Sequence, residues 1–143
     1  MIKSSQKKLE EITNRYRLAD VYLFGSQISG HKHPGSDFDI AVRFEKGIPN
    51  PQKRGKIYGN LFSDLISCFN QKNIDLVFID EAPLHFQFKI VAEGELIYSK
   101  NKENSFNFKE KIINHYRDYK YFIDEYFRGA LKISTRLWKE EIS

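Results

Sequence analysis

The sequence has few of the features that mark a secreted, membrane-spanning or nucleic-acid-binding chain. It holds a single cysteine, Cys68, among 143 residues, which argues against a disulfide framework and predicts a cytoplasmic protein. No stretch approaches the roughly 18 apolar residues of a membrane helix, and residues 1–17 lack the apolar core of a secretory signal. A net charge of +4 is too small to indicate a nucleic-acid ligand.

What the chain does contain suffices for one folded domain with an extension. Hydrophobic residues make up 41% of it and aromatic residues 15%, which is enough for a packed core. Residues 1–99 are nearly neutral, with 13 basic and 12 acidic residues, whereas residues 100–143 carry 10 and 7 and many aromatic side chains. We therefore predict two parts, residues 1–99 and residues 100–143, joined near the polar stretch 99–105.

The spacing of apolar residues predicts helices and strands in alternation, followed by a long helix. Apolar residues recur at alternating intervals of 4 and 3 through residues 109–139, which is the pattern of a sustained amphipathic helix. Before it, the sequence predicts three helices and four strands: helices over 4–18, 51–69 and 83–91, and strands over 20–24, 37–44, 73–79 and 95–98. This order indicates an α/β (α+β) fold with a small mixed sheet flanked by helices.

Two acidic residues in one predicted strand carry the first chemical signal. Asp37 and Asp39 are two residues apart, so their carboxylates lie on the same face of the strand. Two like charges at that distance oppose each other's ionisation, and a divalent cation removes the conflict. Mg²⁺ prefers such oxygen ligands and commonly shares them with substrate phosphates. Asp37 and Asp39 are therefore candidate metal ligands.

Residues just before and after this pair extend the candidate site. Gly25 and Ser26 follow the first predicted strand, and ten residues separate Ser26 from Asp37. Glycine permits close approach to a phosphate, and a capped helical turn offers free N–H groups. Asp75 stands alone in an otherwise apolar strand and is the candidate third acid. Asp80 competes for that role but is better interpreted as a helix-start residue. The set predicts a site for a metal-bound nucleoside triphosphate.

The run FGSQISGHKHPGSDFDIAV resembles the glycine-serine and paired-aspartate motif of the DNA polymerase β-like nucleotidyltransferases, in their minimal (MNT) branch. The segments NIDLVFID and APLHFQFKIVAEGELIYSK resemble the strand of the third acid and the elements after it. The C-terminal HYRDYKYFIDEYFRGALK is similar to the last helix of the MntA antitoxins. The resemblance covers roughly residues 8–135.

The resemblance implies a nucleotidyltransferase fold and an antitoxin that neutralises a HEPN-domain RNase toxin. It implies transfer of AMP from ATP to a toxin tyrosine, with Asp37, Asp39 and Asp75 as catalytic residues that bind Mg²⁺, two ions being expected. Gly25 and Ser26 would bind the phosphates of ATP. The alternatives are an antitoxin that only binds and masks its toxin, a small-molecule nucleotidyltransferase, and an enzyme acting on RNA ends; direct nucleic-acid binding is not expected.

Two features leave the sequence interpretation open. Many relatives carry an arginine where this chain has Ser29, which weakens the expectation of tight nucleotide binding. Arg43, on the same strand face as Asp37 and Asp39, is a candidate replacement. The aromatic stripe of the last predicted helix either completes the core of the body or docks a helical partner. Both interpretations hold if some turns pack on the body and others bind the partner.

Overall fold

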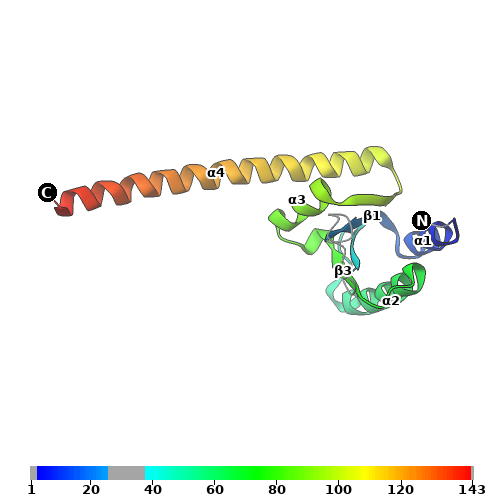
Figure 1. The fold of residues 1–143 in the computed structure, drawn as a ribbon. Coiled ribbons are helices and arrows are strands. Elements are labelled where there is room, and N and C mark those ends of the chain that lie inside the picture. Colours follow the sequence, from blue (N-terminus) through cyan, green and yellow to red (C-terminus); the bar gives the residue numbers. More distant parts are fainter. Residues whose placement is uncertain (1–2, 26–37, 143) are drawn as a thin grey trace.

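The computed structural model describes residues 3–25 and 38–142, which form a four-stranded sheet with helices on both faces (Figure 1). The elements follow one another in the expected order and are listed here with their bounds: α1 (Lys3–Tyr16), β1 (Leu18–Phe24), β2 (Phe38–Phe44), α2 (Pro51–Phe69), β3 (Ile74–Phe78), the 3₁₀ helix η2 (Ile79–Glu81), α3 (Leu84–Glu93), β4 (Glu95–Ser99) and α4 (Lys102–Ile142). The predicted α/β fold with a small mixed sheet and a long C-terminal helix is confirmed.

The sheet is mixed and has the strand order β3-β2-β1-β4. β1 pairs antiparallel with β2 and with β4, whereas β2 and β3 run parallel. β1 begins two residues earlier than predicted because Arg17 takes a left-handed conformation, with φ of 55°, that ends α1 and turns the chain directly into the strand. The central position of β2, between β1 and β3, puts its residues where both neighbouring strands can supply further site residues.

The helices α1 and α2 cover one face of the sheet and build the larger core. On the inner side of α2, Leu61, Leu65 and Cys68 are buried in one core with residues of β2 and β3. The bounds of α2 match the prediction because both ends carry strong signals. The side chain of Asn50 accepts a hydrogen bond from the backbone N–H of Gln52, with Pro51 in the first turn; Asn70 then ends the helix in the left-handed region.

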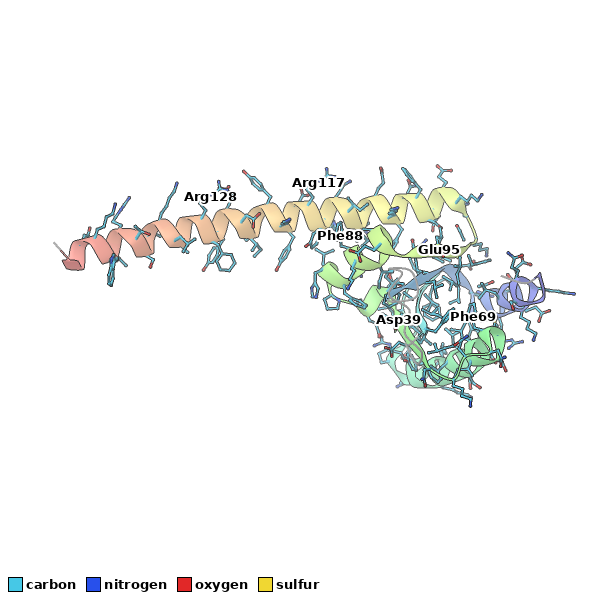
Figure 2. The ribbon with its side chains drawn as sticks, viewed as in Figure 1. Asp39, Phe69, Phe88, Glu95, Arg117 and Arg128 are labelled. Carbon is cyan, nitrogen blue, oxygen red and sulfur yellow. The ribbon has the colours of Figure 1, made fainter. Side chains whose placement is uncertain are left out.

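The opposite face is covered by α3 and by the first turns of α4. Ile90 and Val91 of α3 and Ile112 of α4 are buried against Tyr22 and Phe24 of β1, together with other sheet residues. Farther along, the rings of Phe88 and Tyr116 stack with their centroids 4.1 Å apart, and Figure 2 shows Phe88 between α3 and α4. Part of the aromatic stripe of α4 therefore does complete the core.

The helix α4 begins at Lys102, seven residues before the predicted start at residue 109, and the chain passes from β4 to α4 within the polar stretch 99–105. Asn101 caps the helix, because its side-chain Oδ1 accepts a hydrogen bond from the backbone N–H of Asn104 at 3.0 Å. Ser105 is almost fully buried, and its hydroxyl donates a hydrogen bond to the Asp20 carboxylate of β1. The division into a domain of residues 1–99 and an extension of residues 100–143 stays a prediction.

Beyond Tyr116, α4 leaves the body and projects as an isolated helix (Figure 1). Its distal part, from residue 119 onward, carries large apolar side chains that are each more than half exposed. We call them the distal apolar stripe: Tyr119, Tyr121, Phe122, Tyr126, Phe127, Leu131, Ile133, Leu137 and Trp138. Exposure of this extent on one helix is typical of a surface that another protein covers.

Candidate active site

Asp39 and Asp75 occupy matched positions on neighbouring strands. The parallel pairing of β2 with β3 places Asp39 opposite Asp75. Ile40 packs against α1 and α2 while Ala41 packs on the α3 side, so alternation places Asp39 on the α3 side as well. Asp75 follows the buried Ile74 and is itself exposed. The two acids therefore share one face at the ends of two strands, as the sequence predicted; their chemical roles stay predictions.

Gly25 brings the backbone after β1 against the Asp39 side chain. Phe24, the last residue of β1, pairs with Asp39 of β2, and Gly25 then takes a left-handed φ of 83°. A Cβ atom at this position would lie 2.0 Å from Oδ2 of Asp39, far inside van der Waals contact. Only glycine meets both the conformation and the close approach. The main chain therefore passes directly over the carboxylate, as a phosphate-binding turn beside a metal ligand requires.

The remaining predicted site residues lie outside the described part of the chain. These are Ser26 and Asp37, together with Ser29 at the position where relatives carry arginine. Their placement and roles stay predictions.

The described residues fit the expected metal in donor chemistry. Within residues 3–25 and 38–142 no group of three His, Cys, Asp or Glu side chains is arranged to hold a metal ion, which is consistent with one of the three predicted ligands, Asp37, lying outside that part. The two described acids, Asp39 and Asp75, offer carboxylate oxygens on adjacent strands. Oxygen-only donors of this kind suit Mg²⁺ and do not suit softer metals such as zinc.

Asp80, the competing candidate for the third acid, lies in a different environment. It belongs to η2, after the end of β3, and is not in register with Asp39. Burial raises the pKa of the Asp80 carboxyl above its usual value of 3.8, and the charge of Asp20 raises it further, while Arg43 and Lys111 oppose the shift. Asp75 therefore remains the better candidate, since it faces Asp39 directly.

Arg43 lies on the expected face of β2, but its guanidinium is directed away from the paired acids. Its Nε donates a hydrogen bond to Oδ2 of Asp20 at 2.6 Å, and Nη2 donates to Oδ1 of Asn104 at 2.6 Å. These contacts contradict the suggestion that Arg43 replaces the missing arginine at Ser29. Sequence reasoning missed Asp20, although an acid at the start of an apolar strand is the same signal that selected Asp75.

Tyr58 of α2 was also missed, and it closes the outer edge of β3. Its hydroxyl donates a hydrogen bond to the backbone oxygen of Leu76 at 2.9 Å. Burial raises the pKa of this phenol above 10, and the nearby charge of Asp75 adds to the shift. An aromatic residue in an amphipathic helix gives no sequence signal beyond ordinary packing, so this role was visible only in the structure.

Comparison with protein families identifies the family to which the chain belongs. Residues 7–103 match the family described as Polymerase beta, Nucleotidyltransferase, and the match includes every predicted site residue. The chain therefore belongs to this nucleotidyltransferase family. Comparison with curated proteins gives no match.

Solved structures of similar fold come from toxin–antitoxin complexes. One is a chain of a toxin–antitoxin complex with AMP-PNP, at 25% identity and a TM-score of 0.64, covering 80% of this chain and 89% of that one. A second comes from a tri-AMPylated Shewanella oneidensis HEPN toxin in complex with its MNT antitoxin, at 22% identity and a TM-score of 0.58, covering 81% and 87%. A third, from the MntA–HepT toxin–antitoxin complex, has 21% identity, a TM-score of 0.58 and the same coverages.

Across the helices that the structure describes, none is both long enough and apolar enough to cross a membrane.

Proposed function

We propose that this chain is the antitoxin of a HEPN/MNT toxin–antitoxin pair and adenylylates a tyrosine of its HEPN-type RNase toxin in the cytoplasm. The observation that carries the proposal is the geometry around one carboxylate. Asp39 lies opposite Asp75 on the next strand, and Gly25 is held so close to Asp39 that no side chain fits. Membership of the nucleotidyltransferase family and the likeness to a toxin–antitoxin complex with AMP-PNP, an ATP analogue, support this reading.

Each site residue has a role in this proposal. Asp37, Asp39 and Asp75 would hold Mg²⁺, with two ions expected, and Gly25 and Ser26 would bind the phosphates of ATP through the backbone and the serine hydroxyl. Bound Mg²⁺ supplies neutralisation of negative charge on the triphosphate and on the leaving pyrophosphate. Gly25 itself, with a left-handed φ of 83°, lies directly against the Asp39 carboxylate.

The proposed reaction is a displacement at the α-phosphorus of ATP. The phenolic oxygen of the acceptor tyrosine forms a bond to this phosphorus, and the bond from the phosphorus to the bridging oxygen of the β-phosphate breaks. Pyrophosphate leaves with the electron pair, and the tyrosine retains AMP as a phosphodiester. Asp75 receives the phenolic proton, for which its exposed position on β3 is suitable.

The distal apolar stripe of α4 is the proposed docking surface for the toxin. Its nine residues are exposed on the part of α4 that projects beyond the body (Figure 1), so they do not complete the body's core. A helical partner laid along α4 would cover them by helix-on-helix packing. That one of the similar structures holds a tri-AMPylated HEPN toxin supports the choice of a HEPN protein as both partner and acceptor.

An antitoxin that only binds is the second candidate, and the same exposed stripe favours it, since docking alone accounts for that surface. Co-expression of the neighbouring toxin gene with the parent protein, or with its Asp37→Asn/Asp39→Asn variant, distinguishes the enzymatic antitoxin from the antitoxin that only binds. We expect growth arrest to return with the variant, although it still co-purifies with the toxin. Full neutralisation by the variant would contradict the enzymatic proposal and favour masking. A small-molecule nucleotidyltransferase would neutralise no toxin at all.

A further inference from the structure

The base of α4 is joined to the sheet by a polar cluster, buried at Asp20 and Ser105, that the proposed catalytic site does not use. Arg43 of β2 is at its centre. Its guanidinium donates hydrogen bonds to Asp20 and to Asn104, each at 2.6 Å, and its Cζ lies 4.5 Å from the centre of the Phe108 ring. Asn104 and Phe108 belong to the first turns of α4, so one side chain of a central strand holds the helix at two points.

Asp20 makes the matching contact from β1. It is the strand partner of Arg43 and is fully buried. Its second carboxylate oxygen accepts a hydrogen bond from the hydroxyl of Ser105, which is 3% exposed and lies 2.6 Å from the hydroxyl of Ser99. Both members of the buried ion pair are therefore bonded to α4 as well as to each other.

Such a cluster contributes orientation more than stability. A buried ion pair is a weak source of net stability, because desolvation offsets much of its attraction. Its hydrogen bonds are directional, however, whereas the apolar contacts of Ile112 and Tyr116 tolerate small rotations of the helix. The planar guanidinium fixes the direction of each bond that it donates.

We propose that Asp20 and Arg43 are positioning residues that set the direction of α4 relative to β2, the strand that carries Asp39. In the setting of the proposed function, they thereby determine where a partner docked on the distal apolar stripe presents its acceptor tyrosine. The pair acts through α4, and it touches neither the nucleotide nor the acceptor.

The length of α4 makes this direction matter. About 26 residues project beyond Tyr116, which is about 39 Å of helix, so a tilt of about 10° at the base displaces the tip by about 7 Å. Displacements of about 1 Å at a reacting group are enough to slow catalysis. Without a directional contact at its base, α4 would hold a partner at many positions relative to the acids.

The test measures the distance between the body and the distal helix in the full chain. Spin labels are placed at Lys53→Cys on α2 and Lys132→Cys on α4, in a Cys68→Ala background, and the distance distribution is recorded by double electron–electron resonance. We expect one narrow distribution in this parent. Two variants, Asp20→Asn/Arg43→Met and Asn104→Ala/Ser105→Ala, are expected to broaden or shift it by several ångström, in line with the tilt estimate above.

Asp20→Asn/Arg43→Met removes both charges of the ion pair together, whereas Asn104→Ala/Ser105→Ala leaves the ion pair intact. If the former variant does not fold, the distance distribution of the latter tests the proposal. Arg54→Met is the control, because Arg54 pairs with Glu81 at the sheet edge and does not hold α4; its distribution should match the parent. A distribution in Asn104→Ala/Ser105→Ala that also matches the parent, with native circular dichroism, overturns the proposal.

This measurement contains neither nucleotide nor partner, so its result is independent of the proposed function. If AMP transfer to the neighbouring toxin is observed, the same variants should lower kcat for transfer while the affinity for AMP-PNP with Mg²⁺ stays unchanged. A general loss of folding would lower both, and loss of the nucleotide site would lower the affinity first. An unchanged kcat in the variants would overturn the positioning role in transfer.

Discussion

Single residues at the candidate site are constrained mainly by space. Gly25 and Asp39 approach so closely that the side chain of one leaves no room for a side chain on the other. The same carboxylate lies opposite Asp75 across the parallel pair of strands. A substitution that leaves all three acids in place is therefore expected to damage the site as much as removal of an acid.

Gly25→Ala is expected to lower the affinity for AMP-PNP with Mg²⁺ by about tenfold or more, because the added Cβ displaces the Asp39 carboxylate. The left-handed backbone adds a stability loss of about 1–2 kcal/mol. Isothermal titration and urea denaturation measure the two effects. Gly129→Ala is the matched control, since Gly129 lies in α4 with open space around it; binding should not change, and stability should rise slightly. Equal affinities in the two variants would contradict the close-contact argument.

Asp80 gives a pH-dependent prediction. Burial raises the pKa of its carboxyl in the folded protein above the value of 3.8, so the folded state holds this proton more tightly than the unfolded state. Its contribution to stability is then complete below pH 3.8 and is lost as the pH rises through the folded pKa.

Asp80→Asn removes this titration, so the variant should gain free energy of unfolding over the parent as the pH rises above 3.8. The difference should level off once the pH exceeds the folded pKa. Urea denaturation across a pH series measures it, with Asp118→Asn on the exposed surface of α4 as the control. A difference that is constant over the whole series would show that burial of Asp80 does not oppose its ionisation.

Among the elements, those with strong local signals were predicted well. The bounds of α2 follow from Pro51 at its start and from the buried stripe of Leu61, Leu65 and Cys68. The alternation of side chains in β2 correctly predicted that Asp39 points to the face opposite the core built by α1 and α2. This prediction was possible because the side of β2 that faces that core is continuously apolar. Adjacency of Asp39 and Asp75 also followed, since a lone acid in an apolar strand needs a polar neighbour.

The sequence could not show contacts made across the fold. The long helix was predicted to begin at residue 109, but it begins at Lys102, and Ser105 in its first turns is buried against Asp20, 85 residues away along the chain. Arg43 was only a candidate replacement for the arginine missing at Ser29, because the sequence shows its strand face alone, whereas its partners Asp20 and Asn104 come from two other elements. Burial of polar residues by pairing depends on tertiary placement, which local patterns do not contain.

The helix α2 supplies a stability prediction. Leu61→Ala removes a fully buried side chain between α2 and the sheet and should cost about 2–5 kcal/mol of the free energy of unfolding. Leu131→Ala makes the same change on the exposed part of α4 and should stay within about 0.5 kcal/mol of the parent. Urea denaturation measures both. Comparable losses would mean that Leu131 is packed in the isolated protein.

The distal half of α4 supplies the complementary prediction. A chain that ends after Asp118 keeps Ile112 and Tyr116 against the body but lacks the whole distal apolar stripe. We expect its free energy of unfolding to stay within about 1 kcal/mol of the parent, while co-purification with the neighbouring toxin is lost. Loss of folding would show that the stripe supports the body, and retained co-purification would place the docking surface elsewhere.

At the scale of the whole molecule, the proposed catalytic and docking surfaces belong to different parts of one chain. The sheet holds Asp39 and Asp75 near the ends of β2 and β3, and the distal part of α4, which projects beyond the body (Figure 1), carries exposed apolar side chains. The small net charge of +4, too weak to indicate nucleic acid, is concentrated in residues 100–143. This arrangement is consistent with the proposed enzyme, whose protein substrate would be held on α4.

The mass of the partner is the most direct test of this account. The protein encoded by the neighbouring reading frame is incubated with this chain, ATP and Mg²⁺, and its intact mass is measured. We expect one or more additions of the mass of AMP on tyrosine, absent with Asp39→Asn and retained with Asp80→Asn, which changes a carboxyl outside the site. An unmodified partner that nevertheless forms a complex with the parent protein would contradict AMP transfer as the function of this chain.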